Sequence, residues 1–125
     1  RQVAAVQVLN EHVFRTPSTI YIHYTIENNS NLFYRVNTPG AYELKTDDSP
    51  ISLATLAQTQ LDRAMLEELG STKELALTVV HGEAEADDLH PGETTQGVVS
   101  IRQGLKSPAV VQLVFRDGVK ATVVL

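Results

Sequence analysis

The segment from His81 to His90 holds the side chains of this chain best suited to metal chemistry. Two imidazoles and four carboxylates fall within these ten positions, at His81, Glu83, Glu85, Asp87, Asp88 and His90. Hard cations such as Ca²⁺ prefer carboxylate oxygens, and Zn²⁺ is commonly bound by imidazole nitrogens. The candidate metal ligands are therefore His81, Asp87, Asp88 and His90.

The same segment also fits a simpler interpretation. A calcium-binding loop has a central glycine and a terminal glutamate at fixed positions, and this segment lacks that spacing. A zinc site would need a third ligand from another strand, for which His12 and His23 are available. The alternative is a solvated acidic loop that leads into the turn at Pro91-Gly92.

The sequence lacks the common patterns of nucleophilic and phosphate chemistry. None of its serines stands in a Gly-x-Ser-x-Gly pattern, which marks the nucleophile of many hydrolases. Gly92 and Gly97 have the spacing of a phosphate-binding loop, but Val98 occupies the position of the required lysine. The absence of cysteine excludes a disulfide framework, a thiolate zinc site and a cysteine nucleophile. We expect a protein that is not an enzyme and holds no cofactor.

Length and charge limit the classes of partner. A chain of 125 residues with 42% hydrophobic residues fits one domain, over residues 1–125. Its net charge of -5 disfavours nucleic acid, and no apolar run approaches the ~18 residues of a membrane span. The chain begins abruptly at Arg1 and ends inside the apolar alternation of 123–125, which suggests a piece of a longer protein. We therefore expect a protein partner, or a neighbouring domain of the same chain.

Apolar and polar residues alternate with a period of two through much of the sequence. The alternation is clearest over 19–27, where one face carries Ile20, Ile22, Tyr24 and Ile26. Further candidate strands are 3–9, 41–45, 75–80, 96–102, 109–116 and 119–125. Short strands separated by turn residues predict a mainly β protein, an antiparallel β-sandwich of seven to eight strands.

Two hairpins are predicted from turn chemistry and from the parity of the apolar residues. The Asn-rich turn 28–31 joins strand 19–27 to an alternation that resumes over 32–36. In the final hairpin, a three-residue loop over 116–118 pairs Phe115 with Val119, apolar against apolar, and places its glycine in the left-handed conformation. A two-residue loop would instead set an apolar face against a polar one.

One segment departs from the β pattern. Over about residues 50–69, apolar residues recur at helical spacing, at Leu53, Ala57, Leu61, Ala64 and Met65. Pro50 suits the first turn of a helix and Gly70 suits its end, so we expect one inserted amphipathic helix. Leu56 and Leu66 fall outside the apolar stripe and are candidate partner-binding residues, together with the aromatic residues Tyr21 and Phe33.

Three segments carry a resemblance to a known family. They are Tyr21 to Tyr34 (strand, Asn-rich turn, Leu-aromatic), Leu89 to Val99 (Leu-His-Pro-Gly-Glu-Thr-Thr-Gln-Gly-Val-Val) and Val114 to Gly118 (Val-Phe-Arg-Asp-Gly). This combination resembles the immunoglobulin-like accessory domains of exported bacterial proteins, which include the telokin-like lipoprotein domains and the β-sandwich of the TraN family of conjugation proteins. The resemblance implies an immunoglobulin-like, exported and non-enzymatic domain that binds a partner.

We therefore expect a non-catalytic protein-binding or assembly module of an exported or cell-envelope bacterial protein, in the periplasm or outside the cell. The alternative expectation is a metal-dependent carbohydrate-binding domain, or an accessory domain of an enzyme, that uses the acidic segment His81–His90.

Overall fold

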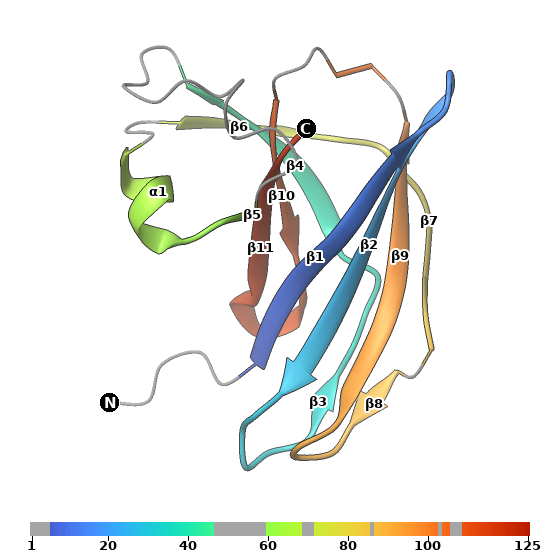
Figure 1. Ribbon diagram of the computed structural model, residues 1–125, viewed down its shortest axis with the longest axis vertical. Coiled ribbons are helices and arrows are strands. Elements are labelled where there is room, and N and C mark those ends of the chain that lie inside the picture. Colours follow the sequence, from blue (N-terminus) through green and yellow to red (C-terminus); the bar gives the residue numbers. More distant parts are fainter. Residues whose placement is uncertain (1–5, 47–59, 69–71, 86, 103, 106–108) are drawn as a thin grey trace.

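Eleven strands and two short helices lie within the described residues of the computed structural model, which are 6–46, 60–68, 72–85, 87–102, 104–105 and 109–125 (Figure 1). The protein is mainly β, as the sequence predicts, and its strand pairs are antiparallel. The predicted number of seven to eight strands is too low for the described residues, because three strands of only two residues each accompany eight longer ones. Within these residues, no helix has the length and apolar character needed to cross a membrane.

One sheet has four strands in the order β1-β2-β9-β7. They are β1 (Val6–Arg15), β2 (Thr19–Asn28), β7 (Val79–Ala84) and β9 (Thr94–Arg102). The alternation predicted for 19–27 is confirmed, because its four apolar residues Ile20, Ile22, Tyr24 and Ile26 are each at most 1% exposed.

A β-bulge in β1 changes which of its side chains face the core. The pairing of β1 with β2 shifts between Asn10 and His12. Because successive side chains of a strand alternate between faces, one extra residue reverses the parity. Val8 is buried before the bulge, and its neighbour Leu9 is exposed on the outer face. After the bulge it is the even-numbered His12 and Phe14 that lie on the outer face.

The second sheet has five strands in the order β5-β11-β10-β4-β6. They are β4 (Gly40–Thr46), β5 (Gln60–Leu61), β6 (Thr72–Ala76), β10 (Val110–Val114) and β11 (Lys120–Val124). A separate two-stranded ladder pairs β3 (Tyr34–Arg35) with β8 (Asp88–Leu89) at the lower end of the molecule (Figure 1).

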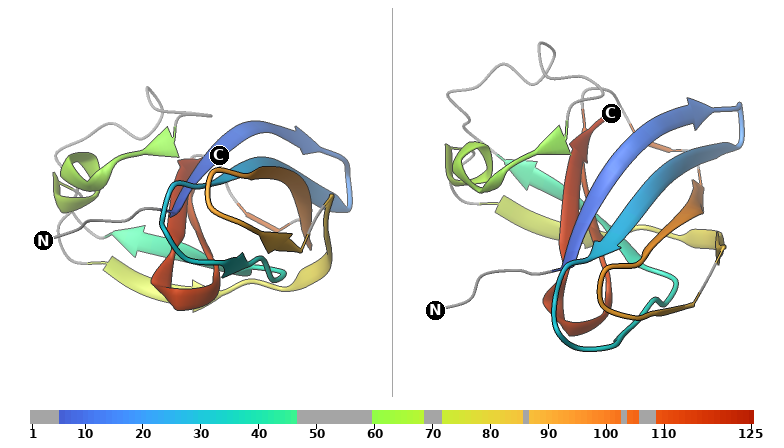
Figure 2. Two further views of the ribbon diagram at one scale, coloured as in Figure 1. Left: turned by 90° about the horizontal axis from the view of Figure 1, so that it is seen from below. Right: turned by 60° about the horizontal axis from the view of Figure 1, so that its bottom comes forward.

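The main core lies between the two larger sheets. It contains Val8, Ile22 and Val99 of the four-stranded sheet together with Val111 and Leu113 of the five-stranded sheet. Figure 2 shows β1 beside β11, where the edges of the two sheets meet. This meeting of edges positions the groove described below.

The hairpin predicted between 19–27 and 32–36 is wrong. The residues after the Asn-rich turn form β3, which pairs with β8, while β2 pairs with β1 and β9. The turn itself depends on a distant segment, because Asn28 Nδ2 donates a hydrogen bond to Leu89 O at 3.0 Å. A partner 61 residues away in sequence cannot be inferred from local alternation.

The strand predicted over 75–80 is divided between the two sheets. Leu77 N–H donates to Ala41 O of the five-stranded sheet, at 2.9 Å. Thr78 O accepts from Arg102 N–H of the four-stranded sheet, at 3.0 Å. The chain thus passes from one sheet to the other across the Leu77–Thr78 peptide.

The helix predicted over 50–69 is wrong at Gln60 and Leu61, which form β5 beside β11. The observed helix, α1, covers Arg63–Glu68, and Asp62 Oδ1 caps it by accepting a hydrogen bond from Met65 N–H at 2.9 Å. Residues 50–59, which include Leu56, lie outside the described residues.

A second, smaller core explains why Leu61 is in a strand. Its side chain is 4% exposed and packs with the buried side chains of Leu44, Val110 and Val124. Leu66 of α1 is partly buried against the same cluster. Pairing with β11 places Leu61 in this cluster, and tertiary packing therefore overrides its helical spacing.

The final hairpin is confirmed. Phe115 N–H donates to Val119 O at 2.7 Å, so the loop consists of the three residues 116–118. Gly118 has a φ of 75°, in the left-handed region as predicted, and Asp117 also adopts a positive φ of 61°.

Candidate functional site

The outer face of the four-stranded sheet carries a cluster of aromatic and imidazole rings. We call Leu9, His12, Phe14, Tyr21 and His23 the aromatic face. Strand pairing builds it, because Leu9 lies opposite Thr25, His12 opposite His23, and Phe14 opposite Tyr21. The bulge at Asn10/His12 is required, since it turns His12 and Phe14 to the same side as Tyr21 and His23.

Three rings of the aromatic face contact one another: His23 lies edge-on to His12 and Phe14, and the His12 and Phe14 rings are tilted by 53°. The ring centroids of His12 and His23 are 5.5 Å apart, and the Phe14 ring lies 5.6 Å from His12 and 5.7 Å from His23. These separations are typical of tilted aromatic pairs. The cluster is nevertheless open to solvent, because Phe14 is 57% exposed, Leu9 44% and Tyr21 37%.

Two glutamates lie at the β7 edge of the same sheet. Glu83 is opposite Val98 of β9, which is itself opposite His23 of β2. Glu85 N–H donates to Gln96 O, two residues before Val98 on β9. His81 Nε2 lies 3.3 Å from Glu83 Oε2, and both side chains are exposed. An open depression of 360 Å³ lies between His23 and these glutamates. A partner of the aromatic face would therefore meet carboxylates at its edge.

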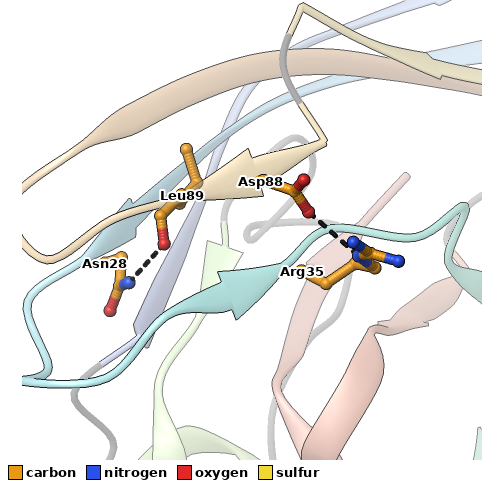
Figure 3. Close-up of polar contacts among 4 residues, drawn as sticks. All are labelled: Asn28, Arg35, Asp88 and Leu89. Carbon is orange, nitrogen blue, oxygen red and sulfur yellow. Dashed lines mark hydrogen bonds and ion pairs between the residues drawn. The ribbon is translucent and has the colours of Figure 1, made fainter.

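The candidate metal ligands have separate contacts. His81 lies near Glu83, whereas Asp88 Oδ1 forms an ion pair with Arg35 Nε at 2.9 Å (Figure 3). The ring of His90 lies edge-on to Phe33, with centroids 5.2 Å apart. Among the residues that the structure describes, no group of three or more histidine, aspartate or glutamate side chains could hold a metal ion.

Asp87 contributes to a different feature, the buried ring of Tyr24. Its backbone oxygen accepts a hydrogen bond from Val36 N–H, and the residue lines a small cavity of 60 Å³ with Tyr24. Burial, and to a smaller extent the carboxylate of Asp87, raises the pKa of Tyr24 to about 12. The Tyr24 hydroxyl therefore remains protonated at neutral pH.

A groove of 670 Å³ runs along the meeting edges of the two sheets. We call it the edge groove. Its walls are the start of β1 and the start of β11, and residues from β5, α1 and the loop after β2 complete it. The structure brings Phe33 and Leu66 together here, because both line this groove. Tyr21 is separate from them, on the aromatic face.

The loop that carries Phe33 is held by Asn28. Asn28 is fully buried, and its Nδ2 donates to Leu32 O at 2.9 Å and to Leu89 O at 3.0 Å (Figure 3). Its Oδ1 accepts hydrogen bonds from Ser30 N–H and Ser30 Oγ. These contacts leave Leu32 and Phe33 at the rim of the edge groove, 74% and 51% exposed.

Tyr34, which also lines the edge groove, is held by a hydrogen bond to the final turn. Its hydroxyl donates to Arg116 O at 2.9 Å and so ties β3 to the final turn. Burial raises the pKa of Tyr34 to about 12; Asp117 adds to this effect and Arg116 opposes it.

Sequence reasoning named Tyr21, Phe33 and Leu66 as candidate partner-binding residues, and the structure places Tyr21 on the aromatic face and the other two in the edge groove. It named His12 only as an available zinc ligand, and it identified neither Phe14 nor the edge groove. The bulge in β1 has no glycine to mark it, so alternation alone places Leu9 and Phe14 on opposite faces. The groove depends on the meeting of two sheet edges, for which a local pattern gives no signal.

Comparison of this chain with protein-family models, with curated proteins and with solved structures finds no match.

Proposed function

We propose that this chain is a non-catalytic protein-binding or assembly module, an immunoglobulin-like β-sandwich domain of an exported or cell-envelope bacterial protein. The observation that supports protein binding is the aromatic face. A sheet face that meets only water normally carries polar side chains. Here Leu9, Phe14 and Tyr21 expose apolar surface on the same face of the sheet. Clustered exposed apolar residues are typical of interaction sites.

The surroundings of the aromatic face suggest the chemistry of the partner. Glu83 and Glu85 lie beyond His23 on the β7 side of the sheet. A partner surface with apolar or aromatic side chains and a border of lysine or arginine would complement this arrangement, and a cation could also lie over the rings. The partner is therefore expected to be a basic protein surface, on another chain or on a neighbouring domain of the same protein.

The immunoglobulin-like class and the exported location are supported by the turn motifs described above. The metal-dependent alternative has no corresponding support in the described residues, because His81, Asp88 and His90 each make separate contacts.

Co-purification of the full-length protein from its source would test this proposal. The informative variant is Phe14→Ser with Tyr21→Ser, which removes two exposed rings and leaves the buried core unchanged. The matched control is Leu75→Ser, at an exposed leucine on β6 of the other sheet. We expect the wild type and the control to retain the same partner, and the double variant to lose it while keeping the wild-type unfolding temperature. Retention of the partner by the folded double variant, or absence of a partner for the wild type, would contradict the proposal.

A further inference from the structure

The second exposed apolar surface, the edge groove, has a strand edge as one of its walls. Val119 and Lys120, the residue before β11 and its first residue, line this groove. Open strand edges expose N–H and C=O groups that can pair with another extended chain. Whether this edge is open depends on the direction of the backbone groups of β11.

Hydrogen bonds to β10 fix that direction. Leu125 and Ala109 exchange both of their backbone hydrogen bonds, at 2.8 and 2.9 Å, and Val119 O accepts from Phe115 N–H. In an antiparallel pair, hydrogen-bonded residues alternate with residues whose N–H and C=O point to the opposite side. Lys120, next to Val119, therefore directs its N–H and C=O away from β10, toward the groove.

The short strand β5 covers another part of the same edge. Leu61 lies opposite Thr122, and Gln60 lies opposite Val123. Lys120 lies beyond the end of β5, because the chain turns into α1 after Asp62. In the described part of the chain, no strand residue pairs with Lys120 on this side. A further strand could therefore pair with the start of β11, next to the end of β5.

The opposite wall of the groove is the edge of β1. Gln60 Nε2 donates to Val8 O at 2.7 Å, so Val8 turns its carbonyl away from β2 and toward β5. This hydrogen bond joins the two sheet edges at one end of the groove. Val6, two residues before Val8, has the same backbone orientation and lines the groove beyond this link.

The groove has an apolar floor and an apolar rim. Val8, Tyr34 and Leu61 line it and are 5%, 5% and 4% exposed. Leu32 and Phe33 stand exposed at the rim. An extended peptide presents every second side chain to one side, so an apolar residue at alternate positions could reach this floor.

We propose that the edge groove binds an extended peptide segment of a partner, which adds as a strand beside β11 and pairs with the N–H and C=O of Lys120. The segment alternates apolar with basic residues. Its apolar side chains contact Val8, Tyr34 and Leu61. Its basic residues face Asp62 and Asp117, two exposed carboxylates that line the groove, whereas Lys120 is the one lysine or arginine among the lining residues that the structure describes. Such strand addition is a common mode of peptide recognition. This site is distinct from the aromatic face.

The test uses a fluorescently labelled peptide, Val-Lys-Val-Lys-Val-Lys-Val, and fluorescence anisotropy with the folded chain. We expect saturable binding. An analogue N-methylated at the central lysine and its two neighbours has nearly the same side chains but loses backbone donors. We expect it to bind at least about fivefold more weakly, since each lost hydrogen bond removes a significant part of the affinity. Equal binding of the two peptides, or no saturable binding of the first, would overturn the proposal.

Two variants at one position locate the site. Lys120→Pro removes the outward N–H, whereas Lys120→Ala removes the side chain and keeps the N–H. We expect Lys120→Pro to weaken binding at least about fivefold relative to Lys120→Ala. If Lys120→Pro does not fold, the shift of the Lys120 amide resonance in the wild type on peptide addition decides the question. An unshifted Lys120 amide, or equal binding by the two folded variants, would place the peptide elsewhere.

The same assay separates this proposal from that for the aromatic face. The variant Phe14→Ser with Tyr21→Ser changes the aromatic face and leaves the groove intact. We expect it to bind the alternating peptide as the wild type does. Loss of peptide binding in that folded variant would assign the peptide to the aromatic face and overturn the groove site.

Discussion

Gly97 of β9 lies directly opposite Tyr24 of β2, and a Cβ atom added at Gly97 would lie 2.5 Å from Tyr24 Oη. The tyrosine ring covers the strand position that has no side chain. It also contacts Phe115, the residue after β10 of the five-stranded sheet, edge-on, with ring centroids 5.0 Å apart. Gly97 therefore allows a residue of one sheet to extend into the core between the sheets.

Gly97→Ala is expected to lower the free energy of unfolding by about 1–3 kcal/mol, because the added methyl group overpacks this position. Equilibrium unfolding in urea would measure the change. Gly40→Ala is the matched control, since an added Cβ there makes an ordinary contact at 3.4 Å with the Tyr42 side chain. Equal unfolding midpoints for the two variants would show that the Tyr24 ring moves aside freely.

Asn28→Asp is expected to destabilise the protein by about 3 kcal/mol at neutral pH. A carboxylate cannot donate to Leu32 O and Leu89 O, and it would place a charge at a fully buried position. Asn29→Asp, one residue along the chain and exposed, is the control. Chemical unfolding of both variants checks this, and a loss smaller than about 1 kcal/mol for Asn28→Asp would contradict it.

Leu61→Ala is expected to cost about 2–5 kcal/mol of stability, because it leaves a cavity in the smaller core. Leu75→Ala removes the same atoms from an exposed position on β6 and should cost much less. Thermal unfolding of both variants gives the comparison. Similar losses for the two would mean that Leu61 is not packed as the structure shows.

Alkaline pH is expected to destabilise the protein above pH 10. The pKa values of Tyr24 and Tyr34 are raised from 10.0 to about 12, so the folded state holds these protons more tightly than the unfolded chain. The resulting stability is fully present below pH 10 and is lost as the pH rises toward 12. Unfolding free energies measured from pH 8 to pH 12 would show this decline.

Tyr34→Phe should reduce that alkaline decline, because one of the two raised groups is removed. It should also cost about 1 kcal/mol at neutral pH, through loss of the hydrogen bond to Arg116 O. An undiminished alkaline decline in this variant would assign the effect to other groups.

The parts of the fold that depend on neighbouring residues could be predicted from the sequence. In the final hairpin, apolar residues of the two strands face each other only if the loop has three residues. The hydrogen bond from Phe115 N–H to Val119 O confirms this loop length. The buried face of β2 follows from its alternation for the same reason. Both features are local, so sequence spacing and side-chain type determine them.

The parts that depend on distant partners could not be predicted. Tyr34 and Val36 continue the alternation of β2, yet Tyr34 lies in β3, which pairs with β8, and Val36 N–H donates to Asp87 O. Leu61 has helical spacing but lies in β5 because β11 offers it a strand edge and a core. Of the candidate site, the exposed aromatic residues Tyr21 and Phe33 were accessible to sequence reasoning, whereas the surfaces they belong to are products of sheet pairing.

The crossing between sheets at Leu77 and Thr78 links the two layers through one peptide bond. The Leu77 N–H donates a hydrogen bond to Ala41 O of one layer, and the Thr78 carbonyl accepts one from Arg102 N–H of the other. Separation of the layers would have to break one of these bonds, because a single peptide cannot follow both layers as they part. Opening of the layers at this point therefore exposes at least one backbone amide, that of Leu77 or that of Arg102. In native-state hydrogen exchange, the amide whose bond breaks should report the free energy of this opening.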